Sequence, residues 1–366
     1  MRLEPVRGGR ALREFLALTD RIYGRNRRFV PPLHSAVRAW QADPAVQLYV
    51  LRDGGQVVAR TTLHTDDAFD AKVGRRVQLF GLTEFVDDDA VVDALFEGIS
   101  AAGRRAGRDE VFGPVSLLPN QSGGVITAGF GERGFVDSAW NHPYYPGAYE
   151  RRGFAPRFCS DTWICPDLQS DTRDVAEVFC FDDARLAAER LEIHRGDRRR
   201  LGQQLPILRE MLNASFGELG YYTEVSAEQL RRATDGLAYL LDERLMLYLT
   251  KAGRPIAFVL CVPDVSAFLS ATAGDLHPGN QLRLLATRSR YRKDAVLIIK
   301  GVVPDEQGNG YARLLSRELL RNLRAGGYHT LRSTWVERTN PASTAQYQAM
   351  GGRPLHGYTF YAKDLA

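Results

Sequence analysis

Apolar and polar residues near the end of the chain are spaced as in a buried strand, a turn and an amphipathic helix. The run AVLIIKGVV, residues 295–303, is rich in β-branched side chains, as expected of a buried strand, and Pro304 ends it. After the turn, Leu315, Leu319 and Leu323 recur four residues apart with arginines between them, which predicts a helix with one apolar face. The glycines of the turn therefore lie at a helix N-terminus, where unpaired amides and the helix dipole favour an anion.

A second strand and helix are predicted in LRSTWVERTNPASTAQYQAMGG, residues 331–352. The strand covers residues 331–336. Asn340 and Pro341 then indicate a helix start, because Asn is a good N-cap and Pro in the first helical turn loses no hydrogen bond. This helix carries Tyr347.

The pattern of strand, glycine turn and strand occurs twice. LYVLRDGGQVVAR (48–60) resembles LYLTKAGRPIAFV (247–259), and the offset of 199 residues between Tyr49 and Tyr248 also carries Asn141 onto Asn340. A shared offset indicates internal duplication.

We therefore predict an α/β chain (α+β, with mixed sheets) made of two tandem domains of one fold, residues 1–165 and 170–366. The connection falls around residues 160–175. Opening helices are expected at residues 10–23 and 206–214, each ahead of its hairpin.

Composition narrows the class of protein. Of the 366 residues, 44% are hydrophobic and 25% charged, which are ordinary globular values, and no apolar stretch is long enough to span a membrane. The N-terminus has no apolar core of a secretory signal, so we expect a soluble cytoplasmic protein without a membrane partner. A net charge of +4 does not indicate a nucleic-acid-binding polycation.

Metal and nucleophile motifs do not occur in the sequence. The four cysteines, Cys159, Cys165, Cys180 and Cys261, have no C-x-x-C spacing, and the seven histidines are scattered. There is no H-E-x-x-H, G-x-S-x-G or Walker motif, so we predict reduced thiols and no metal.

The turn between the first strand and helix carries a family signature. Gln307, Gly310 and Ala312 form Q-x-x-G-x-A, which resembles the acyl-CoA pyrophosphate loop of GCN5-related N-acetyltransferases (GNAT). Asn340, followed seven residues later by Tyr347 and then by a glycine, looks like a second element of that family, although Gly352 stands where an aromatic residue is usual.

This resemblance implies acetyl-CoA or another acyl-CoA as co-substrate. An amide near Val302 or Val303 would donate to the thioester oxygen, and amides from residues 308–312 would hold the pyrophosphate. The cofactor-binding residues so implied are Val302, Val303, Gln307, Gly308, Asn309, Gly310, Tyr311, Ala312 and Asn340.

The reaction implied is direct acyl transfer to an amine, of a small molecule or a peptide, in a ternary complex. Tyr347 stands where the family has its general acid. A base is also needed, because the attacking amine must be neutral. We choose Glu337, which strand alternation places on the face of Trp335 and opposite Val336, with Glu224 in reserve.

The N-terminal copy is predicted to be degenerate. Residues 113–130 lack the loop spacing, although Gly123 and Gly124 could still form an amide cradle. We expect this copy to have lost acyl-CoA binding and to support the fold or wall the acceptor pocket. The candidate wall residues are Trp140, Tyr144, Tyr145 and Tyr149.

Over its whole length the chain resembles bacterial two-domain acetyltransferase-like proteins, through NHPYYPGAYERRGF (141–154), GYYTEVSAEQL (220–230) and STWVERTN (333–340). Such a resemblance implies a fold and leaves the acceptor and the acyl length open. Because an internal repeat can replace a dimer, we expect a monomer.

Two alternatives remain. An aminoacyl-tRNA-dependent transferase on the same tandem fold could use the basic runs at residues 25–28, 195–200 and 288–293 to hold tRNA, although the intact loop argues against it. A non-catalytic acyl-CoA sensor would bind CoA without turnover.

Overall fold

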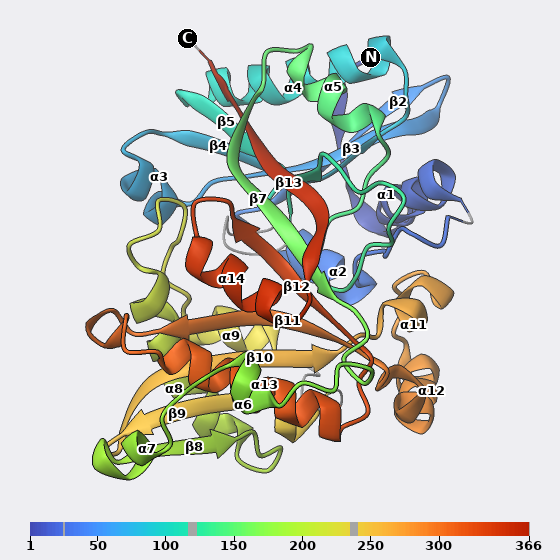
Figure 1. Ribbon diagram of the computed structural model, residues 1–366. Helices are drawn as coiled ribbons and strands as arrows, with labels where there is room; N and C mark the ends of the chain where they lie inside the picture. Colours follow the sequence, from blue (N-terminus) through green and yellow to red (C-terminus); the bar gives the residue numbers. More distant parts are fainter. Residues whose placement is uncertain (25, 116–122, 235–240, 366) are drawn as a thin grey trace.

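One mixed β-sheet runs through both halves of the chain in a computed structural model (Figure 1). The structure describes residues 1–366 except 25, 116–122, 235–240 and 366. The strand order is β1-β2-β3-β4-β5-β13-β7-β12-β11-β10-β9-β8, and the short β6 pairs with β13.

The N-terminal half contains these elements: β1 (Leu3–Pro5), α1 (Gly8–Tyr23), α2 (His34–Ala42), β2 (Gln47–Asp53), β3 (Gln56–His64), α3 (Asp67–Val73), β4 (Val77–Phe85), α4 (Asp89–Arg105), β5 (Glu110–Gly113), β6 (Val125–Ile126), α5 (Tyr144–Glu150) and β7 (Ala155–Cys165).

The C-terminal half contains α6 (Val175–Val178), α7 (Ala184–Ala188), β8 (Leu191–Arg195), α8 (Leu201–Phe216), α9 (Ala227–Ala233), β9 (Met246–Lys251), β10 (Arg254–Pro263), α11 (Ser266–Ala271), α12 (Pro278–Thr287), β11 (Asp294–Val302), α13 (Tyr311–Ala325), β12 (Thr330–Glu337), α14 (Pro341–Ala349) and β13 (Arg353–Asp364). Short 3-10 helices cover Glu243–Leu245, Arg288–Tyr291 and Pro304–Glu306.

The two halves repeat one topology, which confirms the predicted tandem fold. Each has an antiparallel hairpin, β2–β3 or β9–β10, at the predicted offset. Each then has a strand, a helix and a second, parallel strand, with Val77 paired to Glu110 in one half and Asp294 to Thr330 in the other. The second of these parallel pairs, β11 and β12 with α13 between them, is the βαβ unit that carries the family signature.

The last strand of each half lies in the other half of the sheet. β13, at the end of the chain, pairs with β5 through Tyr361 and Gly113. β7, at the end of the N-terminal half, pairs with β12 through Cys165 and Leu331. The segments 1–165 and 170–366 therefore each complete the sheet of the other.

One helix boundary was predicted wrongly. α8 begins at Leu201, and Pro206 lies inside it rather than at its start. A proline inside a helix removes one backbone hydrogen bond, and its ring crowds the carbonyl of the residue four positions earlier, here Gly202. The first helix begins at Gly8, two residues before the predicted start.

An ion network fixes the segment after β6 against the C-terminal half. The Arg133 guanidinium donates to Asp264 at 2.7 Å and to Asp294 at 3.0 Å. Arg332 on β12 also donates to Asp294, at 3.0 Å, and is 8% exposed. Charged groups buried in this way need close partners, so the network holds the two halves in one arrangement.

Candidate functional site

β11 and β12 separate after four paired residues. Their parallel register runs from Asp294 and Thr330 to Leu297 and Ser333, and no later pair joins them. β11 continues along β10 to Val302, and β12 continues along β7 to Glu337. We call this divergence of residues 298–302 from residues 334–337 the splay.

Backbone groups of β11 face the splay. The Val303 amide donates to the Ile256 carbonyl of β10 at 2.9 Å, so it has an acceptor already. Because successive amides of a strand point to opposite sides, the Val302 amide points away from β10 and into the splay. Of the two residues predicted to hold the thioester oxygen, Val302 alone has a suitably oriented amide.

The loop after β11 presents free amides at the start of α13. Gly308 and Gly310 have φ angles of 82° and 84°, in the left-handed region that favours glycine. A Cβ on Gly308 would meet nothing within 4 Å. In the described part of the chain, none of the five amides from Gly308 to Ala312 donates to a protein acceptor. The loop therefore has the geometry of an anion cradle.

Three side chains of the loop form hydrogen bonds within the protein. Gln307 donates to the Val302 carbonyl at 3.1 Å, and Asn309 donates to Glu306 at 3.1 Å. Tyr311 is 1% exposed and its hydroxyl is bonded to Glu189. Of the predicted cofactor residues, the buried Tyr311 can thus offer only its backbone.

Tyr347 is on α14 and packs in the core on the face of the sheet that α13 and α14 cover. Asn340 caps α14 by accepting from the Ser343 amide at 3.1 Å, as its position predicts. Two turns after this cap, Tyr347 is 3% exposed and stacks on Trp163 with ring centroids 5.8 Å apart. Its hydroxyl bonds to the side chain of Ser333, the last paired residue of β12, and burial raises its pKa. The phenol is therefore protonated at neutral pH.

Lys300 lies between the same two helices and was missed in the sequence. Its ammonium donates to Ser316 of α13 at 3.0 Å and to Gln346 of α14. Burial lowers its pKa to about 7. The one available signal was a single lysine inside the apolar run 295–303.

Glu337 lies on the opposite face of the sheet. Its carboxylate accepts from the hydroxyls of Tyr221 and, at 3.1 Å, Thr339. Trp335 packs against Tyr221 on the same face, with centroids 5.1 Å apart, whereas Val336 packs into the core that contains Tyr347. The alternation predicted for this strand is confirmed, so the predicted acid and base are on opposite sides of the splay.

The other candidate residues lie elsewhere. Glu224, the reserve base, is exposed. Trp140, Tyr145 and Tyr149 are buried in the cores of the N-terminal half. Tyr144 packs beside them and donates to the Phe85 carbonyl at 2.6 Å.

Gly123 and Gly124 do not form an amide cradle. The Tyr358 hydroxyl of β13 bonds to the Gly123 carbonyl, and a Cβ on Gly124 would come within 2.4 Å of the Tyr358 ring. These glycines instead allow the chain to pack against β13.

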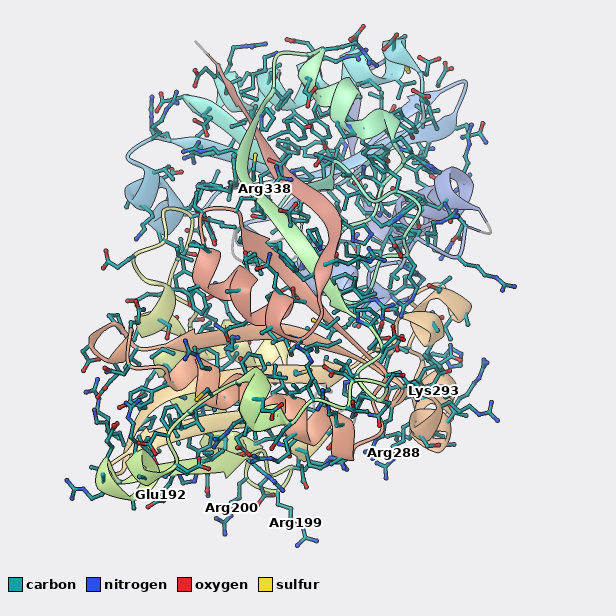
Figure 2. The ribbon with its side chains drawn as sticks, in the orientation of Figure 1. Glu192, Arg199, Arg200, Arg288, Lys293 and Arg338 are labelled. Atoms are coloured by element: carbon teal, nitrogen blue, oxygen red, sulfur yellow. The ribbon has the colours of Figure 1, made fainter. Side chains whose placement is uncertain are left out.

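The basic runs are on the outer surface. Figure 2 shows Arg199, Arg200, Arg288 and Lys293 pointing away from the protein, and all four are exposed. Arg25, in the first run, lies outside the described residues.

The described residues form neither a metal centre nor a disulfide. Among the described residues, no group of three metal-ligating side chains could hold an ion, and the four cysteines are unpaired. No helix in the described part of the chain is long and apolar enough to cross a membrane.

Two curated proteins match nearly the whole chain, although no family model matches it. The chain is 23% identical to the protein YghO of Escherichia coli (strain K12) over 366 residues, which cover 97% of this chain and 93% of that protein. It is 25% identical to the bacterial ceramide synthase of Caulobacter vibrioides (strain NA1000 / CB15N) over 378 residues, which cover 99% of this chain and 97% of the synthase.

Solved structures show the same fold. A tandem GNAT protein from the clavulanic acid biosynthesis pathway superposes with a TM-score of 0.58 at 14% identity, over 100% of this chain and 99% of that protein. The GCN5-related glucosamine N-acetyltransferase region of a fungal multi-domain β-N-acetylglucosaminidase superposes with a TM-score of 0.59 at 14% identity over 98% of this chain. The chain spans only 38% of the length of that fungal protein.

The chain therefore has the tandem GNAT fold, as its sequence predicted.

Proposed function

We propose that the protein is an acyl-CoA-dependent N-acyltransferase whose acceptor is a long-chain amine. The observation that carries the proposal is the row of five free amides at the start of α13, next to the splay of β11 and β12. Phosphate oxygens are natural acceptors for such a row, and the α13 dipole adds to the attraction.

The donor would lie along the loop and enter the splay with its thioester. Amides from Gly308 to Ala312 hold the pyrophosphate in this proposal, and the Val302 amide donates to the thioester oxygen as negative charge develops there. Gly308 supports the assignment because space in front of it is open, so an anion can approach the backbone.

In this proposal the acceptor amine and the CoA thiolate lie on opposite faces of the sheet. The amine approaches on the side of Glu337, which takes its proton, and the nitrogen attacks the thioester carbon. A C–N bond forms, the C–S bond breaks, and the thiolate leaves on the side of Tyr347. The buried Tyr347 hydroxyl is protonated and can donate a hydrogen bond to the sulfur.

The acceptor class is proposed from the relative and the surroundings of Glu337. A ceramide is the amide of a long-chain amino alcohol, and the ceramide synthase matches this chain over nearly its full length. Around Glu337, Trp335, Tyr221 and Phe158 form a continuous aromatic row, with Phe158 and Tyr221 centroids 4.8 Å apart. Such a row suits an alkyl chain and does not suit a charged peptide.

Calorimetric titration with palmitoyl-CoA, followed by a thiol-release assay with sphinganine, tests the proposal. A Gly308→Trp variant fills the amide cradle, and Gly253→Trp is its matched control, because Gly253 has a φ of 84° and open space but lies in the β9–β10 turn. We expect the first variant to lose CoA binding and the control to keep it. No binding by the wild-type protein would contradict the proposal and make charged tRNA the next ligand to test.

A further inference from the structure

Lys300 is a half-buried charged side chain in the last part of β11, where the strand has left the fully buried segment 295–297. It follows Ile298 and Ile299 on the segment of β11 that no longer pairs with β12. Its side chain extends to the α13 and α14 side, where its ammonium donates to Ser316, which is 2% exposed, and to Gln346. Burying a lysine costs free energy, so a lysine in this position needs a reason.

Lys300 is also a neighbour of the predicted acid. Its ammonium nitrogen lies 5.8 Å from the centre of the Tyr347 ring. An ammonium has three N–H groups, and the two hydrogen bonds to Ser316 and Gln346 use two of them. The third remains for a group that enters between the helices, on the side where the thiolate leaves in the proposed reaction.

We propose that Lys300, and not Tyr347, supplies the proton that the departing CoA thiolate takes up. This inference rests on the proposed function. As the C–S bond breaks, the sulfur keeps the electron pair and accepts a proton from the ammonium, which becomes a neutral amine. Water then returns a proton to Lys300, while Glu337 releases to water the proton that it took from the acceptor. Tyr347 orients the sulfur through a hydrogen bond.

The acidities of the three groups favour this direction of transfer. A thiol has a pKa near 8.5. Burial lowers the pKa of Lys300 to about 7 and raises that of Tyr347. The proton therefore moves downhill from lysine to thiolate, whereas it would move uphill from tyrosine.

No charged group close to Lys300 fixes the protonation state of its amine in the described part of the chain. The titratable groups that face it are the thiol of Cys165 on β7 and the phenol of Tyr347 on α14. Within the described residues, no carboxylate forms an ion pair with Lys300 to hold it charged.

If Lys300 only linked α13 to α14, the rate of acyl transfer would not depend on its protonation. The test therefore measures the rate as a function of pH. Single-turnover rates of palmitoyl-CoA and sphinganine, followed by thiol release, are measured between about pH 5.5 and pH 9.5 for the wild type, Lys300→Met and Lys300→Arg. Because the donor must be protonated, the wild-type rate falls as pH rises above about 7. We expect Lys300→Met to be roughly a hundredfold slower and to lack this fall. In Lys300→Arg the guanidinium stays protonated, so the fall disappears or moves to much higher pH.

The control is Lys293→Met, since Lys293 is exposed at the other end of β11 and points to solvent in Figure 2. It should keep the wild-type rate and profile. If Lys300→Met fails to fold, the Lys300→Arg profile decides. The inference is overturned if either variant keeps the wild-type fall in rate, or if Lys300→Met stays within threefold of the wild type. A wild-type protein that transfers no acyl group would overturn the proposed function as well, whereas normal turnover with an indifferent Lys300 overturns this inference alone.

Discussion

The two halves share a topology but differ where a helix follows the first parallel strand. α13 starts with two left-handed glycines and five free amides. α4 starts in the run DDD, residues 87–89, and the Asp88 carboxylate already accepts from the Val91 amide at 3.1 Å. Carboxylates at this position accept hydrogen bonds from the first helical amides and repel a phosphate. The amides at this helix end are therefore free to meet an anion in one half, whereas a carboxylate caps them in the other.

The splay differs in the same way. In the N-terminal half, Val115 closes the space beside β4 by donating to the Phe80 carbonyl at 2.8 Å. Its own carbonyl lies 1.8 Å from where a Cβ of Gly81 would be. The corresponding space between β11 and β12 has no such segment among the described residues. At this position the two halves thus differ in a few connecting residues and not in the sheet.

The largest effect that we predict concerns the strand seam shared by both halves. His356 on β13 is fully buried, bonds to Thr162 at 3.1 Å, and burial lowers its pKa to about 4. The unfolded chain binds a proton below about pH 6.5, whereas the folded chain resists it down to about pH 4, so stability falls as pH decreases through this window. The loss is at most about 3 kcal/mol.

Chemical unfolding at a series of pH values, with hydrogen exchange, measures this loss. We expect the two halves to lose protection together. A His356→Gln variant should lose less stability on acidification than the wild type. Separate transitions for the two halves would show that they behave as independent domains.

A second prediction concerns Glu337, the proposed base. Glu337→Gln should slow acyl transfer roughly a hundredfold while CoA affinity is unchanged, because general base catalysis is lost and the donor site is not. Single-turnover kinetics and calorimetry measure the two quantities. The exposed Glu224→Gln is the matched control, and an equal effect of both changes would remove Glu337 from its role.

A third prediction makes the loop of α13 more like the start of α4. Asn309→Asp changes one nitrogen to oxygen and adds a negative charge beside the cradle, next to Glu306. CoA affinity should fall about tenfold, and added salt should reduce the difference by screening. An affinity equal to that of the wild type would mean that the pyrophosphate lies elsewhere.

The smallest effect is expected from the reverse change. Asp88→Ala removes the cap of α4 and should lower the free energy of unfolding by about 1 kcal/mol without creating a CoA site, because Val115 still closes the splay. Thermal melts and calorimetry with CoA check both parts. New CoA binding in this variant would show that charge alone separates the two halves.

Local features of the fold were predictable from the sequence and distant ones were not. The strand ending before Pro304, the α14 cap at Asn340 and the two faces of β12 follow from neighbouring residues, and the structure has all three. The exchange of β7 and β13 could not be predicted, because pairing between strands so far apart leaves no local pattern.

The candidate site shows the same limit. Lys300 looked like one polar interruption in an apolar strand, and its significance depends on Ser316 and Gln346, which lie 16 and 46 residues away in sequence. The orientation of the Val303 amide depends likewise on its partner Ile256 in β10.

The exchanged strands also bear on how the chain is made. During synthesis, β5 leaves the ribosome long before β13, its partner at Gly113. Until then the N-terminal half has an open sheet edge that could pair with another chain. Its completion waits for residues that are translated much later, so a ribosome that stops before them releases a half without its β13 partner. Each half thus supplies a strand that the sheet of the other half needs.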